Sequence, residues 1–349
     1  MIPAAADDDD VTKDRSGPPG PPRPARPARP VPRPARVVSG AGRAARLVVR
    51  RLGMLALLPA AVFAAIELLP GDAADATSER GESAADMALR RAALGLDRPV
   101  AERFWDWISG LPTGDLGTTA HGQPVTSVLS GPFPNTLLLG SLALALSIIG
   151  ALALGSWAAL RPGGRVDRAV ATTSTAAFAL PEFVVSVALL LVFSQWAGWL
   201  PAVTLTGPDG APASWNMLVL PLLALAIPQI GWNTRIVRGA LADQAGLPHV
   251  QAAIIDGLPR HRVLTHHMLP GALPAVAVST ATSAGMLVGG AVVVETLFNY
   301  PGVGAVLAGA IADRDTPLVA GVVVATGAAI STLLLLADFV RERILGTDR

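Results

Sequence analysis

Side chains that could bind a metal or act as nucleophiles are few in this chain. There is no cysteine, which excludes disulfides, thiolate metal sites and cysteine nucleophiles. His261, His266 and His267 lie close together, and His121 stands far from them in the sequence. A metal site needs convergent ligands, and a serine nucleophile needs a neighbouring base, yet the serine- and threonine-rich apolar segments contain no histidine. We therefore expect no metal site, no catalytic residue and no enzymatic activity.

The sequence also lacks the motif for binding the phosphates of a nucleotide. A phosphate-binding P-loop requires the pattern Gly-x-x-x-x-Gly-Lys-Ser/Thr, and the only lysine is Lys13, close to the N-terminus. Any ATP hydrolysis must therefore come from another chain, and we expect this one to bind no cofactor. The net charge of +1, from 27 basic and 26 acidic residues, argues against nucleic acid as a partner.

The elements that must carry any function are membrane helices. Hydrophobic residues make up 51% of the chain, charged residues make up 15%, and the mean hydropathy is +0.49, unlike a soluble protein. About 20 apolar helical residues cross the roughly 30 Å of hydrocarbon in a bilayer. Six segments have approximately this length and composition: Leu52–Leu69, Thr136–Leu160, Ala169–Phe193, Trp215–Thr234, Gly271–Val294 and Pro317–Ala337. The sequence predicts an all-α, polytopic membrane protein with six transmembrane helices.

The basic residues predict how these helices are oriented. With six spans, one side of the membrane holds 21 Lys and Arg residues and the opposite side holds 6. The excess lies in residues 1–51, 160–168, 235–267 and 341–349. Because basic residues accumulate in cytoplasmic segments, we expect a multi-pass protein of the cell membrane with both termini in the cytoplasm.

The domain organisation follows from these spans. We expect a disordered Pro/Arg-rich cytoplasmic tail (1–46), a first transmembrane helix (47–70), an extracytoplasmic loop region (71–134), a five-helix core (135–340) that includes a cytoplasmic loop (241–268), and a cytoplasmic C-terminus (341–349). The tail either contacts membrane lipid or a partner domain, or is an extension without such a role. Within the first loop region, Ser83–Leu94 and Pro99–Ser109 are predicted helices, ended by Gly95 and Gly110.

The cytoplasmic loop between the fourth and fifth spans contains a predicted short helix. Pro248 suits a helix start and Gly257 suits a helix end. Val250, Ala253 and Ile254 form an apolar stripe on one face. Such a helix suits contact with a soluble partner protein, and its composition is equally compatible with a connector at the membrane interface.

Several short motifs along the chain occur together in one known family. They are Leu68-Leu69-Pro70-Gly71-Asp72, Leu94-Gly95-Leu96-Asp97-Arg98-Pro99, Gly114-Asp115-Leu116-Gly117, Gly198-Trp199-Leu200-Pro201, Gln251-Ala252-Ala253 with Gly257 and Leu269-Pro270, and Gly290 to Phe298 followed by Tyr300-Pro301-Gly302-Val303-Gly304. In this order on six spans, the chain resembles the permease subunits of dipeptide/oligopeptide/nickel-type ABC importers, in the first-permease subclass. The resemblance covers about residues 46–345.

The resemblance implies that the chain forms, with a second permease subunit, the path for peptides or a related small solute. Two ATP-binding-cassette ATPase subunits would use ATP, and an extracytoplasmic solute-binding protein would deliver the solute. It implies that the coupling loop to the ATPase contains Gln251, Ala252, Ala253, Asp256, Gly257 and Pro270. Gln251 stands where the family's name-giving glutamate is expected. The alternative is a secondary, ion-gradient-driven transporter, which would typically show inverted repeats and paired broken helices.

Two carboxylates inside the spans are candidates for the path or a gate. Glu182 follows Pro181 in the third span, and Glu295 ends the fifth. Charge inside a membrane is costly and therefore often functional, although both carboxylates could also lie near interfacial depth and hydrogen-bond to backbone. Gly289 and Gly290, close to Glu295, would allow helices to approach and slide, or would simply pack closely.

Overall fold

A computed structural model describes residues 40–78, 82–208 and 210–345. The chain divides into two units, Met1–Arg46 and Leu47–Arg349, and the account below concerns the second. The expected tail covers residues 1–46; residues 1–39 lie outside the described part, and helix α1 begins at Gly40, within the expected tail. Residues 346–349 of the expected C-terminus also lie outside it.

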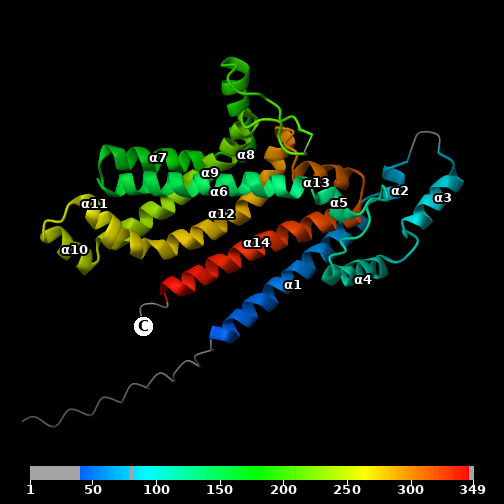
Figure 1. The fold of residues 1–349 in the computed structure, drawn as a ribbon, viewed down its shortest axis with the longest axis horizontal. Coiled ribbons are helices and arrows are strands. Elements are labelled where there is room, and N and C mark those ends of the chain that lie inside the picture. Colours follow the sequence, from blue (N-terminus) through cyan, green and yellow to red (C-terminus); the bar gives the residue numbers. More distant parts are fainter. Residues whose placement is uncertain (1–39, 79–81, 209, 346–349) are drawn as a thin grey trace, which may run out of the picture. The chain divides into compact units, whose positions relative to one another are not determined.

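The described residues form helices joined by short connections, without strands (Figure 1). The α-helices are α1 (Gly40–Glu67), α2 (Ala73–Ala76), α3 (Ala84–Ala93), α4 (Val100–Gly110), α5 (Val125–Leu129), α6 (Pro132–Ala159), α7 (Arg165–Ala179), α8 (Glu182–Leu189), α9 (Asn216–Ala245), α10 (Pro248–Ile255), α11 (Arg260–Arg262), α12 (Leu269–Leu297), α13 (Val303–Ala312) and α14 (Thr316–Leu345). π-Helical segments follow α8 (Leu190–Trp196) and α11 (Val263–Met268). The all-α prediction is confirmed for these residues.

Four helical stretches are long and apolar enough to cross a membrane: Val125–Ala159, Asn216–Ala245, Arg260–Leu297 and Thr316–Leu335. A fifth candidate is the pair α7 and α8 with its π-helical extension, whose two parts meet at 101°. The predicted first span contains the shorter apolar helix Gly53–Glu67. The described residues therefore contain four or five candidate spans by length and composition, and the predicted number of six is not established.

The third predicted span, Ala169–Phe193, is not one continuous helix. It breaks between Ala179 and Glu182, where Leu180 takes extended backbone angles (φ −84°, ψ 125°). The following Pro181 has no N–H to donate, and its ring disfavours a helical conformation in the residue before it. α9 nevertheless continues through its own prolines, Pro221 and Pro228.

The central helix of the bundle is α9, which packs against α6, α7, α8 and α12. Glycines allow two of these close approaches. A Cβ on Gly155 of α6 would lie 2.7 Å from Cγ1 of Val237, and a Cβ on Gly231 of α9 would lie 2.8 Å from the backbone N of Phe178 in α7. Helices in lipid associate through such close packing, because apolar side chains gain little by leaving hydrocarbon.

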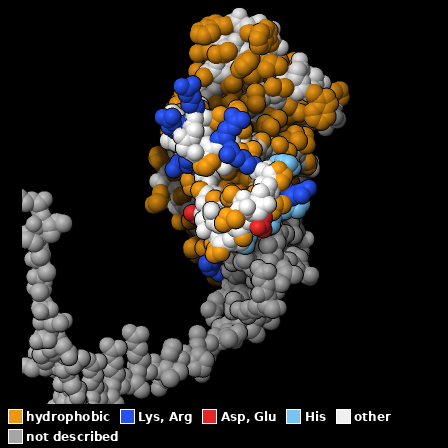
Figure 2. Space-filling model, turned by 90° about the vertical axis from the view of Figure 1, so that its left-hand side faces the viewer, with side chains coloured by type: hydrophobic (Ala, Val, Ile, Leu, Met, Phe, Trp, Pro, Cys, Tyr) orange, Lys and Arg blue, Asp and Glu red, His pale blue; other side chains and the backbone are white. Residues whose placement is uncertain are grey.

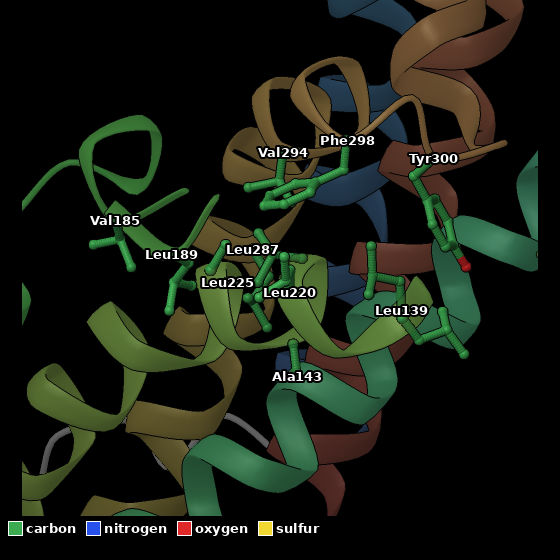
Figure 3. Packing of buried hydrophobic residues seen from close by; sticks show 12 residues of the cluster. Leu139, Ala143, Val185, Leu189, Leu220, Leu225, Leu287, Val294, Phe298 and Tyr300 are labelled. Atoms are coloured by element: carbon green, nitrogen blue, oxygen red, sulfur yellow. The ribbon is translucent and has the colours of Figure 1, made fainter. Parts of the chain in front are cut away.

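One hydrophobic cluster joins the bundle near α13 (Figure 3). The labelled side chains of Figure 3 converge from four helices and the turn after α12: Leu139 and Ala143 of α6, Val185 and Leu189 of α8, Leu220 and Leu225 of α9, Leu287 and Val294 of α12, then Phe298 and Tyr300. This packing holds the turn that carries Tyr300 against the spans.

Helices α2 to α5 lie between α1 and α6 in sequence (Figure 1). Of these, α4 packs against α1 and α14, and α5 packs against α14. α3 and α4 confirm the two helices predicted for this region. The buried Trp107 contacts Phe63 of α1 and Ala320 of α14, and its Nε1 donates a hydrogen bond to the carbonyl of Leu116 (2.8 Å). α4 thus joins the corresponding ends of α1 and α14.

Candidate functional site

Helix α10 forms because both of its ends carry strong local signals. Pro248 occupies the first turn, where its missing N–H removes no hydrogen bond. Gly257 adopts φ 75°, and the amides of Gly257 and Leu258 donate to the carbonyls of Ile254 (3.0 Å) and Ala253 (3.2 Å). These two bonds form the Schellman arrangement that ends a helix at a left-handed residue. The short helix predicted between Pro248 and Gly257 is confirmed.

The inner face of α10 is fixed to the bundle. Val250 and Ala253 are buried in a hydrophobic cluster with Leu241 of α9 and with Val263 and Met268 of the π-helical segment before α12. Because close-packed interiors transmit displacement, a force on α10 acts on α9 and on the start of α12 together.

The outer face of α10 is open and partly apolar. Gln251, Ala252 and Asp256 are exposed, and the exposed fractions of Ile254 and Ile255 are 51% and 83%. Of the predicted stripe of Val250, Ala253 and Ile254, the bundle buries the first two, and Ile254 is exposed. Residues three and four positions after Val250 diverge by about 100° around the helix, and the packing surface covers only the first of them. Two adjacent exposed isoleucines leave an apolar patch that a partner protein could cover.

Basic and histidine side chains lie at the same end of the molecule as α10 (Figure 2), among them Arg260, His261 and Arg262 of α11. Figure 2 views the molecule from the end where α10 and α11 lie and shows Lys, Arg and His side chains on this face beside exposed hydrophobic ones. Pro270, predicted to belong to the same loop, is exposed in the first turn of α12. Within the described ranges, no group of three or more His, Asp and Glu side chains could hold a metal ion.

Near the opposite end of α12, Glu295 is completely buried. Its Oε1 accepts a hydrogen bond from Oγ1 of Thr136 in α6 (2.7 Å), and its Oε2 accepts one from the backbone N of Gly304 (2.6 Å). Oγ1 of Thr136 in turn accepts a bond from the backbone N of Val303 (2.9 Å). Val303 and Gly304 begin α13, and the first amides of a helix have no acceptor within it. Glu295 and Thr136 therefore cap α13 and attach it to α12 and α6.

The turn before α13 is held by a second set of buried contacts. The hydroxyl of Tyr300 donates to the carbonyl of Asn135 (2.8 Å), and Nδ2 of Asn135 donates to the carbonyls of Pro301 (2.7 Å) and Gly210 (2.8 Å). Burial raises the pKa of Tyr300, and the nearby carboxylate of Glu295 raises it further. The phenol therefore keeps its proton and remains a donor.

Of the other candidate path residues, Glu182 and Gly290 lie side by side. A Cβ on Gly290 would be 3.3 Å from Cγ and Oε1 of Glu182, so the missing side chain lets α8 approach α12. Glu182 stands in the first turn of α8, where the helix dipole favours a carboxylate, and it forms no ion pair with a described residue. Gly289 is exposed, and a Cβ there would meet no atom within 4 Å. Glu295 belongs instead to the contacts that cap α13.

A buried polar cluster in the middle of the bundle is not predicted from the sequence. Nδ2 of Asn233 in α9 donates to Oγ of Ser283 (2.8 Å) and, more weakly, to Oγ of Ser147 (3.5 Å), and its Oδ1 accepts from Ser279. These bonds join α6, α9 and α12, because side-chain hydrogen bonds between spans replace water where lipid offers none. The available signal is an asparagine within the uncharged apolar segment Trp215–Thr234.

Comparison with known proteins decides the family. Residues 151–345 match the family described as binding-protein-dependent transport system inner membrane component. The chain belongs to this family. A probable peptide ABC transporter permease protein of Sinorhizobium fredii is 31% identical over 84% of this chain and 94% of its own length. A glutathione transport system permease protein of Pectobacterium atrosepticum is also 31% identical, over 84% and 95%.

The match to this family and to these relatives confirms the relationship to ABC importer permeases that the motifs predict. Among solved structures, the MetNI methionine ABC transporter in an inward-facing conformation aligns with a TM-score of 0.48 at 17% identity, covering 64% of this chain and 96% of that chain. The family is one of transporter permeases, not a class of enzymes, and its ATP is used by partner ATPase subunits.

Proposed function

We propose that this permease pairs with a second permease subunit to form the path by which peptides, or a related small solute, enter the cell. Two ATP-binding-cassette ATPase subunits provide the energy, and an extracytoplasmic solute-binding protein delivers the solute. Relatives with peptide in their names support the solute class. The observation that carries the mechanism is α10, a helix with an exposed apolar face on a chain without a P-loop.

The topology that fits this role has six spans and both termini in the cytoplasm. The four long spans and the bent α7–α8 pair account for five. We assign the sixth to α1, whose apolar part, Gly53–Glu67, is shorter than the other spans and follows Arg50 and Arg51 at its cytoplasmic end. α10 lies within the basic segment 235–267, and Arg260 of this segment bonds to Leu160 at the start of the basic segment 160–168. These basic residues support a cytoplasmic position for α10. Residues 71–134 and α13 then lie outside the cytoplasm.

Movement passes from the ATPases to the spans through α10. The exposed face formed by Gln251, Ala252, Ile254, Ile255 and Asp256 meets the ATPase. The buried face passes the displacement to α9 and α12, which contain the polar cluster around Asn233. Closure of the ATPases thereby shifts the permease pair between its inward-open and outward-open states, because the closed ATPases bind α10 with different affinity in the two states.

The opposite end of the spans provides the gate. Glu182, Gly289 and Gly290 border the path where α8 approaches α12. Glu295 is a positioning residue, since its contacts with Thr136 and Gly304 make α13 move together with α6 and α12.

The test of this mechanism is replacement of an exposed apolar side chain on α10 by a charged one. In the complete transporter, Ile255→Asp should lower co-purification of the ATPase subunits and solute-stimulated ATPase activity at least about tenfold, because an apolar contact becomes a buried charge. Gly246→Ala is the matched control, since Gly246 lies just before α10 with ordinary backbone angles (φ −81°). Unchanged assembly and stimulated ATPase activity in Ile255→Asp would refute the coupling role of α10.

A further inference from the structure

A cavity of about 400 Å³ lies between α7 and α9, in the half of α9 nearer to α10. Its walls include Ala171, Ser174 and Thr175 of α7 and Trp232, Thr234 and Arg235 of α9. Two of these side chains have buried polar atoms without a hydrogen-bond partner, Oγ1 of Thr234 and Nε1 of Trp232. Thr234 is 1% exposed, so water does not satisfy its hydroxyl from the surface. Buried polar atoms are nearly always paired, and these two therefore indicate a missing partner.

Arg235 contributes the unpaired positive charge of this cavity. Its guanidinium lies 5.9 Å from the centre of the Phe178 ring and forms no ion pair with any residue that the structure describes. The neighbouring Arg238 is already bonded to Asp167 (2.5 and 3.1 Å), which is the carboxylate that α7 offers here. Cation and carboxylate cancel in that pair, so the cavity keeps the charge of Arg235.

Arg235 directly follows the predicted span Trp215–Thr234 and lies at the cytoplasmic end of the apolar part of α9, which restricts what it can face. It is the twentieth residue of the 30-residue helix α9, and its side chain is exposed. An arginine that faces hydrocarbon is costly, so such residues face a water-filled cavity or another protein. Arg235 therefore faces water or another protein and not hydrocarbon, at the cytoplasmic end of the span.

A second cavity, of about 460 Å³, adjoins the first and is apolar. Trp232 and Ile236 of α9 line both, and α12 adds Pro274, Ala275 and Val278 to the second. The two cavities together therefore place a cation, an indole N–H and a hydroxyl next to an apolar recess.

We propose that this pair of cavities binds an amphipathic solute, with a free carboxylate on Arg235 and Trp232 and an apolar side chain in the recess formed with α12. Guanidinium groups bind carboxylates through two parallel hydrogen bonds, and the indole N–H supplies a further donor. A peptide with a free C-terminus has both parts. The inference rests on the proposed import of peptides and assigns to this permease a contribution to selecting them.

The test compares uptake of tritiated Ala-Phe with uptake of its C-terminal amide. Both are measured in proteoliposomes that contain the complete transporter, with binding protein at saturating concentration. Wild type should prefer the free acid. Arg235→Gln should lower uptake of the acid by about tenfold or more, in keeping with loss of a charge-assisted bond, and leave uptake of the amide unchanged. Because each variant uses the same binding protein, the ratio of acid to amide isolates the permease contribution.

Two further variants make the test specific. Arg235→Lys keeps the charge without the planar guanidinium and should restore part of the preference for the acid. Arg161→Gln removes an exposed arginine from the α6–α7 turn and should change neither rate. Amide uptake by Arg235→Gln also shows that the variant folds and assembles.

Each other result overturns the inference. If uptake of acid and amide falls equally in Arg235→Gln, Arg235 serves assembly or movement and does not recognise carboxylate. If neither rate changes, the cavity is not part of the path. If wild-type transporter takes up neither compound, import of such peptides is refuted and the inference is refuted with it.

Discussion

The attachment of α13 through Glu295 leads to a sharp prediction about two substitutions at one position. Glu295→Met keeps the length of the side chain but offers no acceptor to Oγ1 of Thr136 or to the N–H of Gly304. Glu295→Gln removes the charge and still offers an amide oxygen to the N–H of Gly304. Its amide N–H₂ can donate to Oγ1 of Thr136, but in both variants the Thr136 hydroxyl loses the carboxylate as its acceptor. Comparing the two variants separates the contribution of hydrogen bonding from that of charge.

The expected magnitudes follow from these contacts. Each buried donor left without an acceptor costs about 1–3 kcal/mol. The methionine variant leaves one more such donor than the glutamine variant, the N–H of Gly304, and so loses about 1–3 kcal/mol relative to glutamine. Removing a buried carboxylate that has no cationic partner among the described residues acts in the opposite direction, by several kcal/mol if it is ionised. That gain is common to both variants. Glu295→Gln should therefore lose no more than about 1 kcal/mol of unfolding free energy relative to wild type. Glu295→Met should be clearly less stable than Glu295→Gln.

The measurement has a global and a local part. Thermal unfolding of the purified permease in lipid nanodiscs gives the order of stability. Hydrogen exchange of the backbone amides of Val303 and Gly304 reports whether the start of α13 is still capped. Exchange at Gly304 should accelerate in Glu295→Met and stay slow in Glu295→Gln, because only the methionine leaves that amide without an acceptor. The amide of Val303 keeps Oγ1 of Thr136 in both variants and serves as an internal reference.

Glu182→Met is the matched control. Glu182 is also a carboxylate at the end of an apolar helix, but it lies beside Gly290 of α12, whereas Glu295 accepts a hydrogen bond from Gly304 of α13. Its replacement should leave α13 exchange unchanged. Equal stability of Glu295→Met and Glu295→Gln, with equal exchange at Gly304, would show that the side chain of Glu295 does not hold α13.

Three further predictions concern the ends of the spans. Gly257→Val should abolish solute-stimulated ATPase activity but not membrane insertion, because a β-branched residue at φ 75° costs about 1–2 kcal/mol and disrupts the end of α10. The control Gly246→Val, at φ −81°, should be tolerated. Retained stimulated activity in Gly257→Val would contradict the role of α10 in coupling. Since the chain has no cysteine, a single cysteine at Leu89 should react with a membrane-impermeant maleimide in intact cells, and one at Ile255 should react only after permeabilisation; the reverse result would invert the topology. Partial burial alone would raise the pKa of Asp72, but bonds from Arg91 and the backbone amides of Asp75 and Ala74 outweigh it and lower that pKa. The stabilisation by ionised Asp72 is present above the ordinary carboxyl pKa and is lost as pH falls below about 4, so the melting temperature should fall less steeply with acid in Asp72→Asn than in wild type. Because Asp72 and Arg91 are about one-third exposed, the contribution to the free energy of unfolding should stay below about 1 kcal/mol. Equal dependence of the melting temperature on pH in the two proteins would contradict this contribution.

Local signals in the sequence correctly predict several elements, for a simple reason. Pro248 and Gly257 bound α10, and Ser83 caps α3, through interactions among residues a few positions apart. Helix ends of this kind depend on backbone conformation and short-range hydrogen bonds, which neighbouring residues determine. Four of the six predicted spans likewise appear as long helices, because hydrophobic length alone indicates them.

The sequence is less informative about where a helix bends and which side chains it buries. Pro181 indicates a perturbation of the third span, but the 101° angle depends on how α8 packs against α9 and α12. Pro221 and Pro228 are the same residue type, and α9 continues through both. Tight packing of α9 on four other helices holds it together, an effect that no local pattern contains.

The sequence by itself determined that this chain is a helical membrane protein without a P-loop, with a surface helix between two spans and the motifs of an ABC importer permease. Only the tertiary structure showed that Glu295 caps α13 through Thr136, 159 positions away, and that Arg235 lacks the carboxylate that Arg238 has. The difference has one physical cause. Hydrophobicity and helix ends are properties of contiguous residues, whereas the partner of a buried polar group is chosen by the packing of segments far apart in the chain.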